Sequence, residues 1–302
     1  MLLLSTLTVA LVFPGEASQA HSPRLKTETN SLGMTLVKLP KGAFTMGDRS
    51  CKKIPKMCED PQGGSNKVAC SDGSMVQKCR GKPDERPLHL VRLTRAFWMM
   101  ETEVTQGHYD EVMGNPPSHL SASKGDYRSP TTAMEEVSWY DAVTFANKLS
   151  QIEGLAACYE GSGESTQWKS DCTGYRLPTE AEWECAARAG QLVVYSGSNV
   201  VDEVAWHSDN ADGKPHEVGQ KKPNEWHLYD MSGNVREWVW DRYAPYTGNV
   251  ANPRGPTSGI TRVLRGGSWD SYVRDVRISY RFAFRPEHRY QGVGFRLVRT
   301  AQ

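Results

Sequence analysis

The chain has 302 residues, a formal net charge of +1 and 38% hydrophobic residues. This length suits one large domain or two small ones and is sufficient to bury a hydrophobic core. The near-neutral charge, without a long basic run, excludes a typical nucleic-acid-binding surface.

Residues 1–13 are an apolar run, followed by Pro14 and Gly15 and by a small-x-small pattern at residues 18–20. This arrangement is typical of an export signal, and the run is too short to span a membrane. We therefore expect residues 1–20 to be a signal peptide, residues 21–32 a lead-in, and the mature protein to be periplasmic or secreted without a transmembrane helix. Because the run is not preceded by Lys or Arg, an uncleaved anchor and a cytosolic chain are the alternatives.

Residues 34–47 alternate like two strands around a Pro-Lys-Gly turn, and a polar insert at residues 50–80 follows. The insert has no hydrophobic periodicity, so it cannot build its own core and needs cross-links. It holds four cysteines, which predict two disulfides: Cys51, Cys58, Cys70 and Cys79. Four thiolates could instead bind zinc, but their spacing lacks the closely spaced pairs that zinc sites use.

Three further cysteines lie outside the insert. Cys158 and Cys172 flank a Gly- and Ser-containing loop and predict a third disulfide. Cys185 lies within a helical pattern and is expected to be a free thiol in the core.

Residues 89–94 and 97–105 alternate like strands, and three helices are predicted around them. Thr105 is a helix N-cap with Gly114 as the stop, and Ser138 with Asp141 forms the cap of a second helix. Thr179 and Glu182 form the capping box of a third helix that ends at Gly190. Beyond Gly190 short strands, turns and Trp residues dominate, so we predict one loop-rich α+β domain over residues 33–300.

An ordered series of motifs runs through this domain: MTLVKLPKGAFTMGD, ETEVTQGHYDEVMG, YRLPTEAEWECAARAG, NEWHLYDMSGNVREWVWD, RVLRGGSWDS and GVGFRLVR. Together they resemble the formylglycine-generating enzyme family, also called sulfatase-modifying factor domains. The resemblance implies a single loop-rich α+β fold that is related to C-type lectins.

The GNVREW motif predicts a calcium site. Asn234 and Glu237 are three residues apart, so their oxygens can converge on a hard cation together with the carbonyl of Val235. The resemblance implies a structural calcium site at these same three residues. Alternatively, Asn234 caps a turn and Glu237 pairs with an arginine.

The Gly-Gly-Ser turn marks the expected site. Copper-dependent family members carry two cysteines after this turn, which bind Cu(I) through soft thiolates. The matching positions here are Ser271 and either Val276 or Arg277, so the sulfur ligands are missing and copper is not expected. The candidates for lining a pocket are Ser268, Trp269, Ser271 and Arg281.

Arginines are frequent in the same segment. We expect Arg281, Arg285 and Arg296 to pair with buried carboxylates such as Glu182, Glu184 or Glu237. The alternative is a cleft for an acidic peptide or an anionic ligand, with Arg274 and Arg277 at its rim.

Three functions follow from this resemblance. The first is an exported non-copper variant that acts in the maturation of a peptide or peptide-derived product. The second is a non-catalytic binding or accessory module for a peptide or protein partner. The third is formylglycine generation on sulfatases, which the missing cysteines disfavour.

Overall fold

The computed structural model describes residues 25–50, 52–55, 57–59, 67–69, 75–78, 81–114 and 129–301, and a five-stranded antiparallel sheet lies at its centre. The strands, in spatial order, are β1 (Thr27–Thr29), β2 (Thr35–Leu39), β9 (Phe97–Met100), β18 (Val298–Thr300) and β12 (Tyr175–Arg176). The first and last parts of the domain therefore pair with each other, since β18 lies between β9 and β12.

Both faces of this sheet are buried. Successive side chains of a strand point to opposite faces, and in β2 Leu36 belongs to one core whereas Val37 belongs to the other. Likewise Trp98 and Met100 of β9 face the first core, and Met99 faces the second. This position explains why the Phe-Trp-Met-Met run has no polar face.

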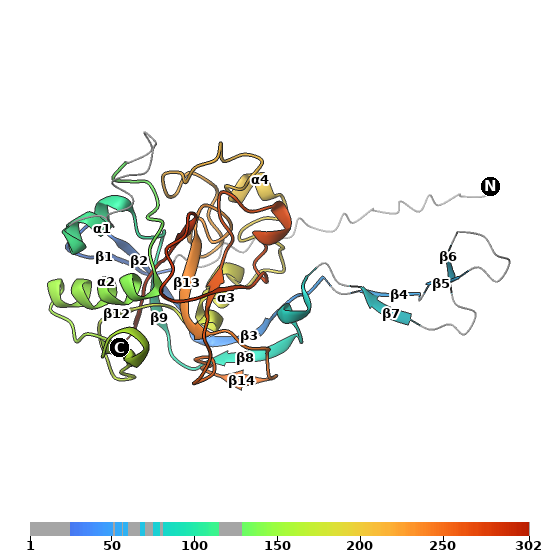
Figure 1. Cartoon of the computed structure of the whole chain (residues 1–302), viewed down its shortest axis with the longest axis horizontal. Helices are drawn as coiled ribbons and strands as arrows, with labels where there is room; N and C mark the ends of the chain where they lie inside the picture. The colour runs from blue at the N-terminus through green and yellow to red at the C-terminus, as the bar shows by residue number, and fades with distance from the viewer. Residues whose placement is uncertain are drawn as a thin grey trace, which may run out of the picture.

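Helices cover the sheet on each side. α1 (Gln106–Met113) and α2 (Trp139–Ile152) lie together and fill the first core, whereas α3 (Glu180–Arg188) packs in the second (Figure 1). The N-caps are as predicted: the Thr105 Oγ accepts from the His108 amide, and capping boxes begin α2 and α3. One more α-helix, α4 (Val201–Val204), has only one turn and was not predicted.

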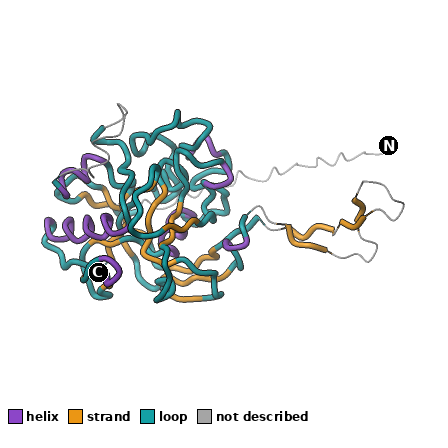
Figure 2. Tube along the Cα trace, viewed as in Figure 1, coloured by secondary structure: helices purple, strands orange, loops and turns teal. Residues whose placement is uncertain are grey.

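Two smaller sheets and a hairpin complete the domain. The four-stranded sheet contains, in order, β16 (Phe282–Phe284), β15 (Arg262–Arg265), β13 (Arg236–Arg242) and β17 (Val293–Gly294). The three-stranded sheet contains β14 (Val250–Ala251), β8 (His89–Leu93) and β3 (Gly42–Met46), and the hairpin contains β10 (Tyr159–Glu160) and β11 (Gln167–Trp168). Loops connect most of these short strands, as Figure 2 shows, so the predicted loop-rich α+β domain is confirmed.

One strand prediction needs correction. The predicted strand at residues 97–105 ends at Met100, and β8 and β9 belong to different sheets. The chain turns at residues 94–96, so β8 pairs with β3 while β9 pairs with β2.

The insert contains the strand pairs β4 (Lys52–Pro55) with β7 (Met75–Lys78) and β5 (Met57–Glu59) with β6 (Lys67–Ala69). Figure 1 shows these strands extending away from the rest of the domain. Cys51, Cys70 and Cys79 lie outside the described residues, as does the predicted signal at residues 1–20, and the side chain of Cys58 is not described. The two disulfides of the insert therefore stay predictions.

The other cysteines are as predicted. Cys158 and Cys172 form a disulfide with a Cα–Cα distance of 4.9 Å. Cys185 is free and buried. Among the described ranges, no helix has the length and apolar character needed to cross a membrane.

Candidate functional site

The Gly-Gly-Ser turn directly follows β15 and depends on its glycines. Gly266 and Gly267 have φ values of 90° and 72°, in the left-handed region that favours glycine. A Cβ on Gly267 would lie 2.7 Å from the carbonyl oxygen of Asp275 and from a methyl group of Val276. The turn is therefore packed directly against the following loop.

The two serines of this turn are buried and engaged in hydrogen bonds. The amide of Ser268 donates to Ser271 Oγ at 2.9 Å, and the two hydroxyl oxygens are 3.2 Å apart. Ser271 Oγ also accepts from Arg236 Nη2 at 2.9 Å, and Ser268 Oγ donates to Asp270. These hydroxyls hold the turn together, and neither lines the best-formed cavities of the described residues.

Trp269, which follows the first of these serines, is held by a hydrogen bond of its indole ring. Its Nε1 donates to Glu135 Oε2 at 3.0 Å, and the amide of Gly292 donates to the same oxygen at 2.5 Å. Burial raises the pKa of the Glu135 carboxyl, while these two donors lower it. Trp269 thus joins the turn to the loop before β17.

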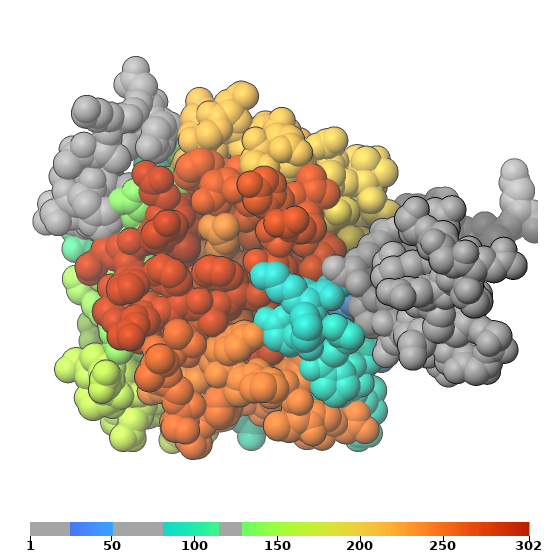
Figure 3. Space-filling model, turned by 45° about the vertical axis from the view of Figure 1, so that its right-hand side comes forward, coloured from blue at the N-terminus to red at the C-terminus, as the bar shows by residue number. Residues whose placement is uncertain are grey.

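Aromatic residues lie in the segment that follows this turn, and we call Tyr272, Phe282, Phe284 and Tyr290 the aromatic surface. Three of these rings are exposed, whereas Phe284 is partly buried against the first core. Tyr272 is 63% exposed and Tyr290 is 56% exposed. Phe284 contacts both Phe282 and Tyr290, with ring centroids 6.1 Å and 5.4 Å apart. Figure 3 shows the C-terminal part of the chain, in red, forming much of one face of the molecule.

Arginines accompany these rings. The guanidinium of Arg274 lies 5.1 Å from the ring centre of Tyr272, and that of Arg236 lies 5.7 Å from that of Phe282. Because Arg236 also binds Ser271 and Asp270, it connects the aromatic surface to the buried turn.

The predicted pairing of arginines with buried carboxylates is confirmed at two positions. Arg296 binds Glu237 through Nε and Nη2, both at 2.8 Å. Arg281 also pairs with a buried carboxylate, but its partner is Glu180, at 2.6 Å and 2.8 Å, and not Glu182 or Glu184. Arg281 therefore stabilises the interior through an ion pair, although its side chain also borders a cavity.

Two other arginines differ from their predicted places. Arg285 is exposed and lies near the exposed Glu287, not near a buried carboxylate. Arg277 is buried, and its two terminal nitrogens bind Glu85 at 2.7 Å each, although the residue also borders a cavity. The sequence offered no signal for Glu85, because it lies 192 residues away from its partner.

The predicted calcium ligands have other partners. The side chain of Asn234 accepts a hydrogen bond from the amide of His216 at 2.9 Å. Glu237 accepts from Trp183 Nε1 at 2.8 Å in addition to its contact with Arg296. Asn234 therefore stabilises a loop and Glu237 pairs with an arginine, as in the alternative interpretation.

Two carboxyl groups next to Glu237 were missed by the sequence analysis. Both side-chain oxygens of Glu103 and Oδ1 of Asp230 are buried without a hydrogen-bond partner. Burial and mutual repulsion raise the pKa of Glu103 well above its usual range, and burial chiefly raises that of Asp230 to about 6. Oxygen donors of this kind suit a hard cation.

Comparison with known proteins gives the family. The sulfatase-modifying factor enzyme 1-like domain matches residues 22–301. The chain belongs to this family. The chain is 37% identical to the "Chaperone protein LppX" of Paenibacillus barcinonensis, over 68% of this chain and 80% of that protein. It is 27% identical to the formylglycine-generating enzyme of Streptomyces coelicolor, over 97% of both chains. Among solved structures, Treponema denticola variable protein 1 is similar, with a TM-score of 0.70 and 30% identity over 93% of this chain and 100% of that chain.

The copper site of formylglycine-generating enzymes does not fit the residues present here. Ser271 and Arg277 are bound to neighbours as described, and Val276 is a buried apolar side chain. The free thiol, Cys185, does not compensate, because burial and the neighbouring Glu182 and Glu184 raise its pKa to about 12. It stays a protonated thiol and is a poor ligand for Cu(I).

Calcium remains a prediction for this member of the family. In the described part of the chain, no group of three or more His, Cys, Asp or Glu side chains is arranged to hold a metal ion. A calcium ion would therefore need backbone oxygens beside Glu103 and Asp230, where the unpartnered oxygens lie. Metal analysis before and after chelation tests this.

Proposed function

We propose that this chain is an exported, non-copper member of the formylglycine-generating enzyme family that binds a protein or peptide partner through the aromatic surface. The observation that carries this proposal is the contrast at the Gly-Gly-Ser turn. The serine hydroxyls are buried and hydrogen-bonded, whereas the rings of Tyr272, Phe282 and Tyr290 are exposed. A catalytic role in peptide maturation draws no support from hydroxyl groups used in this way.

The aromatic surface has the composition of a binding site. Tyr, Phe and Arg are enriched in protein interfaces, where aromatic rings give large contact areas at a low cost in side-chain entropy. Adjacent exposed rings are uncommon on a surface without a partner. The similarity to a protein named a chaperone supports the same class of function, because chaperones act on other proteins.

Export is part of the proposal. The disulfide between Cys158 and Cys172 supports it, because such bonds persist mainly in oxidising compartments. The apolar run at residues 1–13 agrees with it.

Partner capture tests the binding function. The immobilised full chain is exposed to an extract of the compartment in which it accumulates, and retained proteins are identified by mass spectrometry. A variant with Tyr272→Ser, Phe282→Ser and Tyr290→Ser is expected to lose the retained partner. The matched control changes three exposed apolar residues elsewhere to Ser, namely Leu192, Val200 and Ile260, and is expected to keep it.

Two results would contradict the proposal. If the aromatic variant and the control retain the same partner equally, the aromatic surface is not the binding site. If the purified chain with Cu(I) converts the cysteine of a sulfatase-type peptide to formylglycine, the protein is an enzyme despite its missing thiolates.

A further inference from the structure

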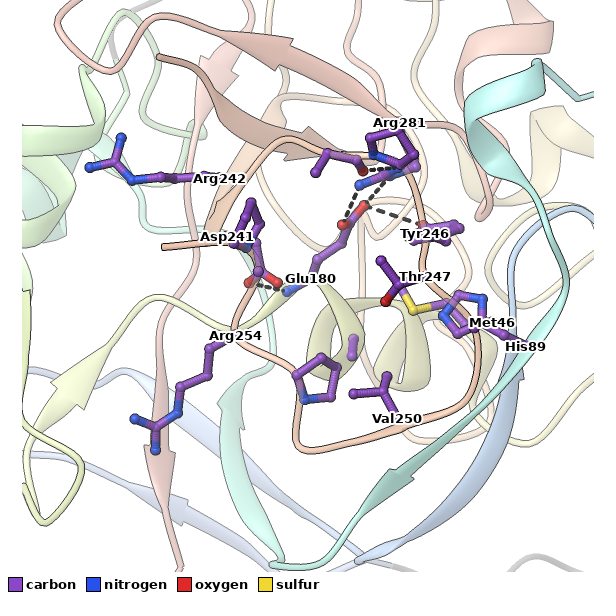
Figure 4. A pocket seen from close by; sticks show the side chains of 17 residues that line it. Met46, His89, Glu180, Asp241, Arg242, Tyr246, Thr247, Val250, Arg254 and Arg281 are labelled. Carbon is purple, nitrogen blue, oxygen red and sulfur yellow. Dashed lines mark hydrogen bonds and ion pairs between the residues drawn. The ribbon is translucent and has the colours of Figure 1, made fainter. Parts of the chain in front are cut away.

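A cavity of about 370 Å³ lies between the end of β13, the start of α3 and the loop that leads to β14. It shares no residue with the aromatic surface. Much of its wall is apolar, with contributions from Met46, Ala181 and Val250 and from three prolines (Figure 4). A volume of this size is at the lower end of small-ligand sites.

One carboxyl group in this wall is incompletely paired. Asp241 is only 4% exposed. Its Oδ2 accepts a hydrogen bond from the amide of Glu180 at 2.8 Å, whereas its Oδ1 has no partner among the described residues. This oxygen can accept a hydrogen bond from a donor, or contact a cation, that enters the cavity.

Two buried arginines next to the start of α3 are already neutralised by its carboxylates. Arg281 binds both oxygens of Glu180, at 2.6 Å and 2.8 Å. Arg265 binds Glu180 at 2.9 Å and Glu184 at 2.5 Å. These cations therefore balance the carboxylates of α3, and neither forms a bond with Asp241.

The other two arginines of the wall also have different partners. Arg242 donates to the carbonyl of Gly259, and the guanidinium of Arg254 lies 4.0 Å from the ring centre of Trp168. Figure 4 shows both guanidinium groups directed away from Asp241. The wall therefore supplies a carboxyl group to which no arginine of the wall is bonded.

The electrostatic surroundings of Asp241 agree with the absence of a bonded cation. Burial, and next the negative charge of Glu180, raise the pKa of the Asp241 carboxyl to about 8, with Glu182 adding to the effect and Arg281 opposing it. A bound cation would relieve this unfavourable environment, because an opposite charge within a few ångströms stabilises the carboxylate.

We propose that this cavity binds a primary alkylammonium group, with Asp241 as its counter-ion and with Met46 and Val250 contacting its alkyl chain. A metal ion would need several oxygen ligands, and of the two carboxyl groups that line this cavity only Asp241 is not bound to an arginine. A guanidinium group prefers two parallel acceptors, whereas the second oxygen of Asp241 is used by the Glu180 amide. An ammonium group at the end of an alkyl chain fits this cavity, because the ammonium can donate to Oδ1 of Asp241 while the alkyl chain contacts the apolar wall. Lysine side chains and free diamines both carry this group.

Calorimetry on the full chain tests this with three probes at neutral pH and low salt. The probes are cadaverine, a short peptide with one lysine, and pentanediol as the neutral analogue of cadaverine. We expect an amine to bind and the diol not to bind. Binding of cadaverine alone indicates a free diamine as the ligand, and binding of the lysine peptide alone indicates a protein side chain.

Variants assign the binding to Asp241. Asp241→Asn keeps an acceptor for the Glu180 amide but removes the charge, so we expect affinity to fall at least about tenfold, as for a lost charge-assisted hydrogen bond. Asp171→Asn, the same change at an exposed position in a neighbouring cleft, is expected to leave affinity unchanged. Val250→Phe narrows the cavity without changing charge and is expected to weaken binding as well.

Several outcomes would overturn the proposal. These are equal affinity of Asp241→Asn and the parent chain, binding of the diol as tightly as the amine, or no binding of either amine at millimolar concentration. If Asp241→Asn does not fold by circular dichroism, the amine–diol comparison and Val250→Phe decide. The aromatic-surface variant is expected to bind the amine normally, which separates this proposal from the proposed function.

Discussion

Replacing Asp241 by Asn is expected to change how the stability of the fold depends on pH. The folded chain keeps the Asp241 proton up to a pKa of about 8, whereas the unfolded chain loses it near the ordinary aspartate pKa of 3.8. Between these values unfolding releases a proton, so rising pH favours unfolding of the parent chain. The contribution of neutral Asp241 to stability is therefore fully present below about pH 4 and is lost as the pH rises to about 8. The Asn variant has no such proton to lose.

The size of the effect follows from the two pKa values. A difference of about 4 corresponds to an upper limit of about 6 kcal/mol. Because Asp241 borders a cavity that can admit water, we expect roughly 2–3 kcal/mol to be realised. The variant should thus gain stability relative to the parent chain as the pH rises.

Urea unfolding across this pH range measures the difference directly. Titrating groups that do not interact with Asp241 affect both chains equally and cancel in the comparison. Asp171→Asn is the control, since a change at an exposed position is expected to alter the free energy of unfolding by less than about 0.5 kcal/mol. A difference between Asp241→Asn and the parent chain that stays constant, or that shrinks as the pH rises, would refute the argument.

Three other predictions concern the disulfide, a buried ion pair and the aromatic surface. Replacing Cys158 and Cys172 by Ala should lower the free energy of unfolding by about 3 kcal/mol, from the loop that the bond closes; an equal loss on reducing the parent chain would agree, and no loss in either case would contradict it. Arg296→Met should lower the free energy of unfolding in urea by about 3–5 kcal/mol, because it leaves Glu237 buried without a cationic partner. Adding Glu237→Leu should restore part of this loss, and a loss no larger than that of an exposed ion pair would contradict the prediction. Tyr272→Ser should change the free energy of unfolding by less than about 0.5 kcal/mol while weakening partner capture, and a large loss of stability would show that this ring is structural.

Local signals in the sequence predicted much of the fold. Each of the three predicted helices begins at the expected cap, because capping involves residues only three positions apart. The strands at residues 34–47 were also predicted correctly, as was the bond between Cys158 and Cys172. The sheet to which each strand belongs was not predicted, since pairing depends on contacts between distant parts of the chain.

The interior of the site was harder to predict for the same reason. Arginines in the C-terminal segment indicated buried ion pairs, but their partners depend on the three-dimensional arrangement. Arg281 binds Glu180, and Arg277 binds Glu85, although the sequence favoured other carboxylates or a surface position. No sequence pattern indicated a role for Asp241, because its unusual environment arises only where the end of β13 packs against the start of α3.

The buried ion pairs of the C-terminal segment have a consequence for how this surface can change over time. Arg277 and Arg281 attach the segment to the interior through buried ion pairs, whereas the exposed rings of Tyr272 and Phe282 contribute little to the stability of the fold. Outward positions can therefore exchange side chains at little cost in stability, because the backbone beneath them is fixed by other residues. The backbone of this segment and its outward-facing side chains therefore depend on different residues, so substitution of the rings leaves the scaffold in place.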